Sequence, residues 1–301
     1  MFEGAYVAIV TPFTKDNRVD YDKLKELIEL QIQGGMDGIV PVGTTGESPT
    51  LNNEEHKKVI ETAVETCRGR IKVIAGTGAN STSEALELTG SALRAGADGT
   101  LQVSPYYNKP NQEGLYRHFS AIADLGLPVI LYNIPGRCGI EIAVDTVARL
   151  AQHPNIKAVK EAAGSVPRVS QILELCDLCV LSGDDPLTLP MMAVGAKGVI
   201  SVAANVAPQP VADLVHAALD GRWKDARHLH KIYFRLFSDM FLDTNPIPVK
   251  AALAMMGRIE ETYRLPLCAL RPALKKRLAD TLRNVKLIVT AQVQPKKINH
   301  R

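Results

Sequence analysis

Short apolar runs rich in β-branched residues recur along the chain, and segments with a helical pattern of apolar positions separate most of them. Eight runs occur: YVAIVTPF from Tyr6, GIVPVG from Gly38, KVIAGTG from Lys72, GTLQVSP from Gly99, PVILYNIP from Pro128, IKAVKEA from Ile156, CVLSGDD from Cys179 and GVISVAAN from Gly198. Each run has the length and composition of a buried β-strand. Their starts are roughly 20 to 35 residues apart, which is about one strand and one helix per repeat.

The segment after the first run shows the helical pattern. In DYDKLKELIELQIQGG, which begins at Asp20, the side chains of Leu24, Leu27, Ile28 and Ile32 fall on one stripe of a helix. Strand and helix repeated eight times in roughly 220 residues predict an α/β protein with a closed (β/α)8 barrel, the TIM barrel. An open, doubly wound sheet is the alternative. The count of eight, and the absence of a G-x-G-x-x-G turn after the first run, favour the barrel.

The strand pattern stops after Asn205, and the rest of the chain predicts helices. One helix is expected from Trp223 to Met240, and another is expected to open near Pro248, because proline suits the first turn of a helix. We therefore expect two parts, a barrel in residues 1–222 and a C-terminal helical region in residues 223–301. Because the barrel is complete without it, the helical region is expected to pack on the barrel or to mediate assembly.

Composition narrows the class of protein. With 301 residues, 46% of them hydrophobic, the chain can bury a large core, while a net charge of +3 is too small to suggest a nucleic-acid-binding surface. No apolar run approaches the ~20 residues that span a bilayer, and Glu3 stands where a signal peptide carries positive charge. We expect a soluble, cytoplasmic protein with reduced thiols, since five irregularly spaced cysteines do not suggest disulfides. The basic segment PKKINHR, residues 295–301, is expected to be a frayed end.

The most informative single residue is Lys160, near the end of the sixth run. In a strand, Ile156, Ala158 and Lys160 share one face, so the lysine is expected to follow two apolar side chains into the interior. In a barrel the chemistry takes place at the carboxyl ends of the strands. Burial there favours the neutral amine, which is the form that attacks a carbonyl group to give a Schiff base. Spacing alone equally allows a lysine that pairs with a buried carboxylate or extends its ammonium group to solvent.

Hydroxyl groups stand at the ends of neighbouring runs. Thr44 is expected to share a strand face with Val42 and Val40, and Tyr132 shares one with Ile130, so both hydroxyls would point inward above apolar layers. Such hydroxyls can carry the proton that Schiff-base formation requires. Taken singly, each could also be a core hydroxyl that bonds to the backbone.

Arg137 lies in the turn-rich segment NIPGRCG after the fifth run. A guanidinium group there can hold a substrate carboxylate through two parallel hydrogen bonds, and a surface ion pair is the alternative. Metal chemistry finds little support. The histidines are scattered, Cys176 and Cys179 form a lone C-x-x-C that favours burial over zinc, and the carboxylates of GDD at 183–185 have no further ligands nearby in the motif.

Several motifs in one order resemble those of the dihydrodipicolinate synthase family. They are GTTGE at Gly43–Glu47, SPYYNKP at Ser104–Pro110, YNIPGR at Tyr132–Arg137, VKEA at Val159–Ala162, GVISV at Gly198–Val202 and NPIPVK at Asn245–Lys250. The resemblance covers nearly the whole chain. It implies condensation of pyruvate with L-aspartate 4-semialdehyde through a lysine Schiff base, the first committed step toward diaminopimelate and lysine. No cofactor and no metal are implied.

The resemblance also implies roles for catalytic residues. Lys160 would form the Schiff base with pyruvate, Tyr132 would donate and accept the proton, and Thr44 and Tyr107 would complete a relay. The tyrosine that matches Tyr107 is similar to one that a neighbouring subunit contributes. A homo-oligomer is therefore expected, commonly a tetramer built from two tight dimers.

Further residues would bind the substrates. By the same resemblance, Thr45 and the backbone at Ile200 would hold pyruvate, and Arg137 would bind the carboxylate of the semialdehyde. Cys138 stands where threonine is common, and by size alone it is filler. Other pyruvate aldolases, such as N-acetylneuraminate lyase and keto-deoxy sugar acid lyases, are similar in barrel, lysine and tyrosine, but they typically lack this arginine and have serine in place of Thr44. A non-catalytic lysine-binding barrel is a third alternative, which the intact catalytic set disfavours.

A second set of residues resembles the lysine feedback site of some family members. The matching residues are Ser48, Leu51, His56, Asn80, Glu84 and Tyr106. Asn53 stands where those members often have histidine. Local structure offers another explanation, because Ser81 with Glu84 and Asn52 with Glu55 have the spacing of helix capping boxes, and His56 could pack in a hydrophobic staple with Leu51.

Overall fold

Eight parallel strands close into a barrel in the computed structural model, which describes residues 2–289. The strands are β1 Gly4–Ala8, β2 Gly38–Val40, β3 Lys72–Gly76, β4 Gly99–Val103, β5 Val129–Asn133, β6 Ile156–Glu161, β7 Cys179–Ser182 and β8 Gly198–Ser201. They pair in chain order, and β8 closes the barrel on β1, with Tyr6 opposite Ile200. All eight predicted strands are confirmed, although β1 starts at Gly4. The doubly wound alternative is wrong.

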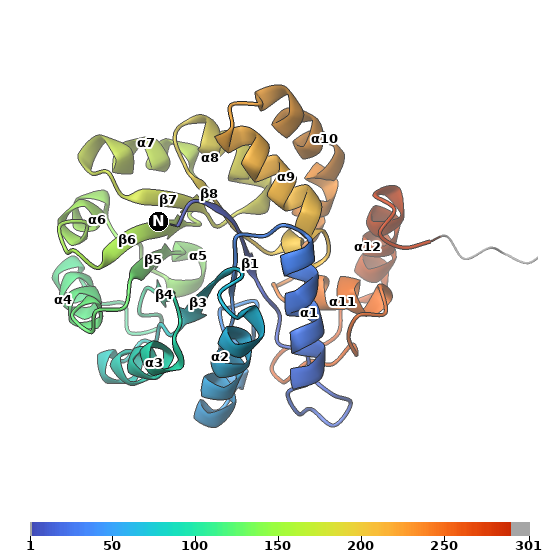
Figure 1. Cartoon of the computed structure of the whole chain (residues 1–301), viewed down its shortest axis with the longest axis horizontal. Helices are drawn as coiled ribbons and strands as arrows, with labels where there is room; N and C mark the ends of the chain where they lie inside the picture. Colours follow the sequence, from blue (N-terminus) through green and yellow to red (C-terminus); the bar gives the residue numbers. More distant parts are fainter. Residues whose placement is uncertain (1, 290–301) are drawn as a thin grey trace, which may run out of the picture.

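Helices surround the barrel on its outside (Figure 1). They are α1 Tyr21–Gln33, α2 Asn53–Cys67, α3 Thr82–Ala95, α4 Gln112–Ala123, α6 Val144–Leu150, α7 Val166–Leu175, α8 Thr188–Ala193 and α9 Pro208–Leu219. The short helix α5 Pro135–Cys138 follows β5 directly and lies inside this ring of helices. Short 3-10 helices occupy Ser48–Thr50, Asp185–Leu187 and Ala203–Asn205. In α1 the predicted stripe faces the barrel, since Leu24, Leu27 and Ile28 are buried and Ile32 packs against the same core.

Two separate apolar cores follow from this arrangement. The larger one lies between the strands and the helices, and the smaller one fills the barrel interior. Ile130 and Ala158 belong to the interior core, and two residues further along their strands stand Tyr132 and Lys160, which are paired across β5 and β6. Because side chains alternate along a strand, Tyr132 and Lys160 also point inward, one layer above the apolar filling. The prediction that Ile156 shares this face is wrong, since Ile156 packs in the larger core and the register between β5 and β6 shifts before Ala158.

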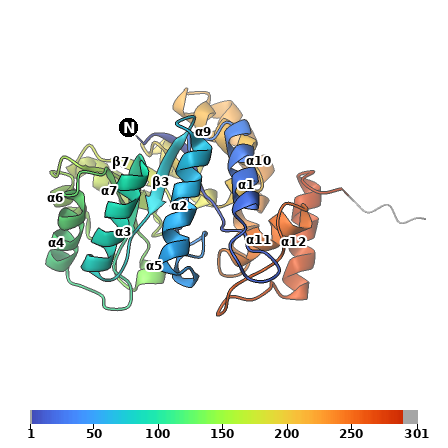
Figure 2. The ribbon, with the colours of Figure 1, turned by 60° about the horizontal axis from the view of Figure 1, so that its bottom comes forward.

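Three helices follow the barrel: α10 Trp223–Asp239, α11 Ile247–Met255 and α12 Pro272–Asn284. The predicted helix from Trp223 is confirmed, and Pro248 does lie in the first turn of α11. Figures 1 and 2 show α11 and α12 on the side of the barrel that also carries α1 and α10. The division after residue 222 stays a prediction, and the predicted frayed end at 295–301 lies outside the described residues.

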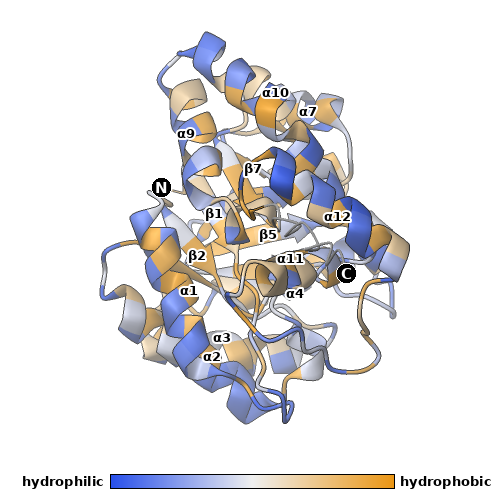
Figure 3. Ribbon diagram, turned by 90° about the vertical axis from the view of Figure 1, so that its right-hand side faces the viewer, coloured by the Kyte–Doolittle hydropathy of each residue, from blue (hydrophilic) through white to orange (hydrophobic). Residues whose placement is uncertain are grey.

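The last two helices differ in burial. Figure 3 shows α12 dominated by hydrophilic residues, and it packs through Leu278 and Leu282. By contrast, every residue of α11 from Ile247 to Leu253 is buried, including Lys250. None of the helices between residues 2 and 289 combines the length and the hydrophobicity needed to span a membrane.

Candidate active site

Lys160 lies almost completely out of solvent at the carboxyl end of β6, with 5% of its surface exposed. Its Nζ stands 4.1 Å from the centre of the Tyr132 ring. Burial lowers the pKa of Lys160 from its ordinary 10.5 to about 8, although Asp184 and Asp185 favour the charged form. At pH 7 roughly one amine in ten is then neutral, compared with about three in ten thousand for an ordinary lysine. The lysine is therefore available as a nucleophile.

The interpretation of Lys160 as half of a buried ion pair is wrong. Among residues 2–289, no carboxylate oxygen lies within 4.0 Å of Nζ of Lys160, the largest distance of an ion pair. Asp184 acts on it from a greater distance, and burial raises the pKa of that carboxyl while the charge of Lys160 lowers it. The lysine thus keeps its amine unpaired beside an attractive negative charge.

The GDD motif makes space for the lysine and shapes the next loop. A Cβ atom on Gly183 would stand 3.0 Å from Cε of Lys160 and 2.6 Å from Cβ of Ala162, so a larger residue here would displace the lysine stem. The carboxylate of Asp185 accepts hydrogen bonds from the Ser201 hydroxyl and from the backbone of Val202, 2.9 Å, and Ala203. It is fully engaged in fixing the turn after β8. The described part of the chain holds no group of three or more His, Cys, Asp or Glu side chains arranged for a metal.

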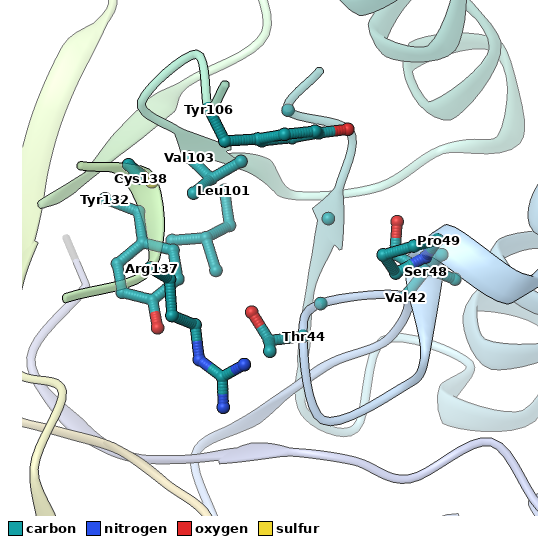
Figure 4. Close-up of a pocket in the computed structure, with 13 residues that line it drawn as sticks. Val42, Thr44, Ser48, Pro49, Leu101, Val103, Tyr106, Tyr132, Arg137 and Cys138 are labelled. Carbon is teal, nitrogen blue, oxygen red and sulfur yellow. The ribbon is translucent and has the colours of Figure 1, made fainter. Parts of the chain in front are cut away.

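Tyr132 supplies a protonated hydroxyl beside Lys160. Burial raises the pKa of this phenol above its ordinary value of 10, while the charge of Arg137 and a hydrogen bond with Thr44 oppose the rise. The hydroxyl is therefore protonated at neutral pH and can donate. Figure 4 shows the Thr44 hydroxyl pointing toward that of Tyr132. The two hydroxyl groups therefore lie together within one chain.

The predicted strand geometry of Thr44 is wrong. Strand β2 ends at Val40, and Val42 has a positive φ of 56°, so the alternation of faces does not continue to Thr44. Close packing explains the early end of the strand. A Cβ atom on Gly76 would stand 2.4 Å from the carbonyl oxygen of Val42, so only glycine lets β3 approach this turn. Thr44 reaches Tyr132 from a loop rather than from a strand.

A cavity of about 230 Å³ opens at this end of the barrel. Its polar lining side chains are Thr44, Ser48, Tyr106, Tyr132, Arg137 and Cys138 (Figure 4). Lys160, Thr45 and Ile200 are buried and do not line this cavity, but Lys160 lies against the ring of Tyr132, which does. Burial raises the pKa of the Cys138 thiol to about 11, so it is a neutral wall residue. The cavity thus reaches the ring of Tyr132, the neighbour of Lys160.

Thr45 and Arg137 are both held by one residue of the C-terminal region. Nδ2 of Asn245 donates a hydrogen bond to Oγ1 of Thr45, 3.0 Å, and the backbone oxygen of Asn245 accepts one from Nη2 of Arg137, also 3.0 Å. The surface ion pair suggested as an alternative for Arg137 is not what the structure shows. The NPIPVK motif marks Asn245 in the sequence, but the sequence does not show that Asn245 contacts the loops of the barrel.

Two predicted site residues, Tyr107 and Ile200, do not place their side chains beside Lys160 as Tyr132 does. Tyr107, in the loop after β4, has 91% of its surface exposed and a φ of 73°, and it is not part of the cavity wall. Ile200 is completely buried, with its side chain in the interior core. A single chain therefore supplies Lys160, Tyr132 and Thr44 together but holds Tyr107 outward.

The residues of the predicted regulatory set lie near the outer part of the cavity. Ser48 and Tyr106 line it, and Nδ2 of Asn80 donates to the backbone oxygen of Tyr106, 3.3 Å. Burial and the nearby charge of Glu84 raise the pKa of Tyr106. Leu51 packs against the large core. Five of the six residues are thus tied to this cavity or to the core beside it.

Local structure explains part of the set but not all of it. The capping box of Asn52 and Glu55 is confirmed, whereas the one predicted for Ser81 and Glu84 is wrong, since Ser81 makes no side-chain capping bond and its hydroxyl pairs with Ser83 instead. His56 is buried, which lowers its pKa to about 4, and it bonds to the Gly76 backbone. Glu84 therefore lacks the capping role that would have explained it without a ligand.

Comparison with known proteins places the whole chain among enzymes of one kind. The family model described as the dihydrodipicolinate synthetase family matches residues 1–285. A curated protein named 4-hydroxy-tetrahydrodipicolinate synthase, from Geotalea daltonii, is 54% identical over 291 residues, which is 96% of this chain and all of that protein.

Solved structures agree with this. The crystal structure of dihydrodipicolinate synthase from Aquifex aeolicus is 51% identical, covers 95% of this chain and 99% of its own, and superposes with a TM-score of 0.93. The chloride-inhibited enzyme from Acinetobacter baumannii, complexed with pyruvate, is 45% identical over 96% and 100% of the two chains, with a TM-score of 0.94. The lysine-bound enzyme from Cyanidioschyzon merolae is 39% identical over 95% and 99%, with a TM-score of 0.92.

Proposed function

Because this chain belongs to the dihydrodipicolinate synthetase family, we propose how its own residues divide the work of the reaction. The chain is a lyase with 4-hydroxy-tetrahydrodipicolinate synthase activity, condensing pyruvate with L-aspartate 4-semialdehyde through a Schiff base in the diaminopimelate route to lysine. The assignment of residues rests above all on one observation. Lys160 is a buried, unpaired lysine whose pKa is lowered to about 8, and it lies against Tyr132 at the reactive end of the barrel.

Lys160 begins the reaction as the nucleophile. Its neutral Nζ attacks the keto carbon of pyruvate, and the resulting carbinolamine loses water to give the Schiff base. Loss of a proton from the pyruvate methyl group then gives an enamine, whose carbon attacks the aldehyde of the second substrate. The burial of Lys160 supports this sequence, because it raises the fraction of the amine that is neutral before the attack.

Tyr132 and Thr44 carry the protons of these steps. The protonated phenol of Tyr132 donates to the hydroxyl that leaves the carbinolamine, and the hydrogen bond with Thr44 gives the proton a route back. Tyr107 would extend the relay toward solvent from a neighbouring subunit, in a homotetramer of tight dimers. In a single chain 91% of the surface of Tyr107 is exposed, which supports this position. A hydroxyl that passes on a proton needs a partner shielded from water, and a single chain gives Tyr107 no such surroundings.

The substrates are held by residues around this relay. Thr45 and the backbone at Ile200 hold the pyruvate carboxylate. Arg137, which lines the cavity with one amino group bound to Asn245, has its remaining donors available for the carboxylate of the semialdehyde. In Arg137→Ala we expect a raised KM for the semialdehyde with imine formation intact, and loss of imine formation would contradict the role.

Trapping tests the central assignment. The protein is incubated with pyruvate, reduced with borohydride, digested and analysed by mass spectrometry. We expect a reduced pyruvate adduct on Lys160 and none on Lys157, which serves as an internal control on the same strand. An adduct on another lysine, or none, would contradict the mechanism.

Mixed oligomers test the position of Tyr107. Lys160→Met and Tyr107→Phe are each expected to be nearly inactive, so the two chains are co-expressed with different tags and the mixed oligomer is purified. If Tyr107 acts across an interface, one site of each mixed dimer combines an intact Lys160 with the partner's intact Tyr107, and activity returns. If it acts within its own chain, no site is complete and activity stays absent.

L-Lysine is proposed as a feedback inhibitor that binds near the outer part of the cavity. The site consists of Ser48, Leu51, His56, Asn80, Glu84 and Tyr106. The lysine-bound relative from Cyanidioschyzon merolae supports this, as does Glu84, whose carboxylate is not used in a cap. In Glu84→Thr we expect lysine inhibition to weaken while kcat without lysine stays unchanged. Equal inhibition of both proteins would contradict the site.

A further inference from the structure

The loop Val42–Glu47, which carries Thr44 and Thr45, has a strained backbone. Val42 and Glu47 both have a φ of 56°, the left-handed region, and neither is glycine. Such residues cost on the order of 1 kcal/mol or more, and a β-branched residue is especially disfavoured there. A loop of this kind keeps its shape only when the surrounding structure holds it.

One support comes from the barrel itself. Oγ1 of Thr11, just after β1, donates a buried hydrogen bond to the backbone oxygen of Gly46, 2.7 Å. On the other side, the backbone of Gly76 donates to the oxygen of Pro41. These contacts hold the two ends of the loop's backbone, but they do not touch the side chains of Thr44, Thr45 or Glu47.

The second support comes from α11, about two hundred residues further along the chain. Nζ of Lys250 pairs with Oε1 of Glu47 at 2.5 Å, and both side chains are completely buried. The same Nζ lies 4.2 Å from the centre of the Phe13 ring and 5.4 Å from that of Tyr263. The ammonium group is thus enclosed by one carboxylate and two aromatic faces, which fix its position.

The residues before α11 reach the same loop at a second point. Asn245 binds the hydroxyl of Thr45 through its side chain and the guanidinium of Arg137 through its backbone. Asn245 and Lys250 together therefore contact three positions around the cavity: Thr45, Glu47 and Arg137.

Stability alone does not account for a buried ion pair in this place. Such pairs lose much of their attraction to desolvation, and replacement of both partners by apolar residues of similar size is often neutral or stabilising. What this pair does supply is a tether between α11 and the loop, because Phe13 and Tyr263 enclose the ammonium group that holds Oε1 of Glu47.

We propose that residues Asn245–Lys250 are a strut of the active site, in which Lys250 and Asn245 are positioning residues that hold Thr44 and Thr45 for the capture of pyruvate. This inference rests on the proposed roles of Lys160, Thr44 and Thr45. It makes the C-terminal region part of the catalytic apparatus, although the barrel closes without it. Lys250 itself touches no substrate.

The decisive comparison uses the double variant Glu47→Met/Lys250→Met. Lys250→Met alone leaves the buried carboxylate of Glu47 without its ammonium partner, with one backbone N–H of Arg264 at 3.5 Å as its remaining contact, and is expected to lower the Tm markedly. The double variant removes both charges, so we expect its Tm to return to near the wild-type value. Its rate of pyruvate imine formation is expected to stay about 10- to 100-fold below wild type, with a raised KM for pyruvate, because the threonines are no longer held in place. The KM for the semialdehyde is expected to change little, since Arg137 keeps its contact with Asn245.

Arg277→Met is the matched control. It breaks an ion pair with the buried Asp239 in the same C-terminal region, at 2.6 Å, far along the chain from the catalytic residues. We expect a lower Tm with an unchanged rate of imine formation. Asn245→Ala gives an independent measurement, because it removes the bond to Thr45 and leaves the pair of Lys250 and Glu47 in place. We expect it to raise the KM for pyruvate by about tenfold.

The outcomes separate the strut from the reaction itself. A double variant that forms the imine at the wild-type rate shows that the pair is only structural, and so does an Asn245→Ala variant with the wild-type KM for pyruvate. Should the double variant not fold, the result for Asn245→Ala decides. Failure of the wild-type protein to form an imine at Lys160 would overturn the proposed residue roles, and that measurement involves none of the strut variants.

Discussion

The end of β6 and the loop after β2 both supply residues to the same site, but they are built in different ways. Lys160 lies in a strand beyond a register shift between β5 and β6, and it is paired with Tyr132 on one side and Leu181 on the other. Its direction follows from strand alternation. Thr44 lies in a loop with left-handed backbone at both ends, and that loop is held by Thr11 and by residues of the C-terminal region. Lys160 is placed by its own strand, while Thr44 lies in a loop that distant contacts hold.

This difference indicates which substitutions the end of β6 and the loop after β2 each tolerate. A strand residue paired on both sides keeps its direction when a neighbour changes, because the ladder holds the backbone. A strained loop depends on every contact that holds it, so loss of a remote side chain can move its threonines. Rate losses from changes far away should therefore appear for the loop and not for Lys160.

The largest effect is expected for Lys160→Met, which tests the strand side of the comparison. Activity should fall by roughly four to six orders of magnitude, as for removal of a catalytic nucleophile, and borohydride trapping should fail. Stability should rise. The drop in pKa from 10.5 to about 8 means that the buried ammonium costs roughly 3 kcal/mol at neutral pH. Methionine removes that cost, so denaturation at pH 7 should show a larger free energy of unfolding for Lys160→Met than for the wild type.

The sign of this stability effect depends on pH. The folded state holds the lysine neutral more readily than the unfolded state, so the cost is complete below pH 8 and disappears as the pH rises toward 10.5. The advantage of Lys160→Met should therefore shrink above pH 8. A Met variant that is less stable than wild type at pH 7 would contradict the buried, unpaired lysine.

A smaller effect is expected for Thr44→Val, which tests the relay side. The change removes the hydroxyl that bonds to Tyr132 and keeps the shape of the side chain. We expect kcat to fall by about 10²-fold, the lower end for the loss of general acid–base help, with the imine still trapped on Lys160. Thr66→Val is the control, since its hydroxyl bonds only within α2. Equal kcat values for both variants would remove Thr44 from the relay.

Gly183→Ala tests whether a shift of the Lys160 side chain slows imine formation. The added Cβ atom would stand 3.0 Å from Cε of Lys160, so the stem must shift, and we expect imine formation to slow by about tenfold. Gly90→Ala is the control within α3, where an added Cβ atom would stand at an ordinary 3.5 Å from Nη1 of Arg94. Wild-type rates in Gly183→Ala would show that β6 tolerates crowding better than its packing suggests.

The smallest effect is the pH dependence of the wild-type protein. Because imine formation needs the neutral amine, its rate should rise about fivefold from pH 7 to 8 and less than twofold from pH 8 to 9, following the pKa of about 8. Rapid-quench trapping at saturating pyruvate measures this. A rate that keeps rising tenfold per pH unit up to pH 10 would show an ordinary lysine.

Periodicity was sufficient for much of the fold. The eight strands, the stripe of α1 and the inward direction of Lys160 and Tyr132 all follow from patterns only a few residues long, which a strand or a helix converts directly into a face. The capping box of Asn52 and Glu55 is equally local. That of Ser81 and Glu84 has the same spacing and fails, because the Ser81 hydroxyl pairs with Ser83. Spacing permits a local bond without requiring it.

What the sequence determined by itself is therefore the barrel, its strands and the place of Lys160, since each depends on near neighbours along the chain. Only the tertiary structure decided how Thr44 reaches Tyr132, that Tyr107 faces outward, and that Asn245 and Lys250 brace the loop after β2. These contacts join residues up to about two hundred positions apart. No periodic pattern encodes them, because they form only when the closed barrel and the C-terminal helices pack against each other.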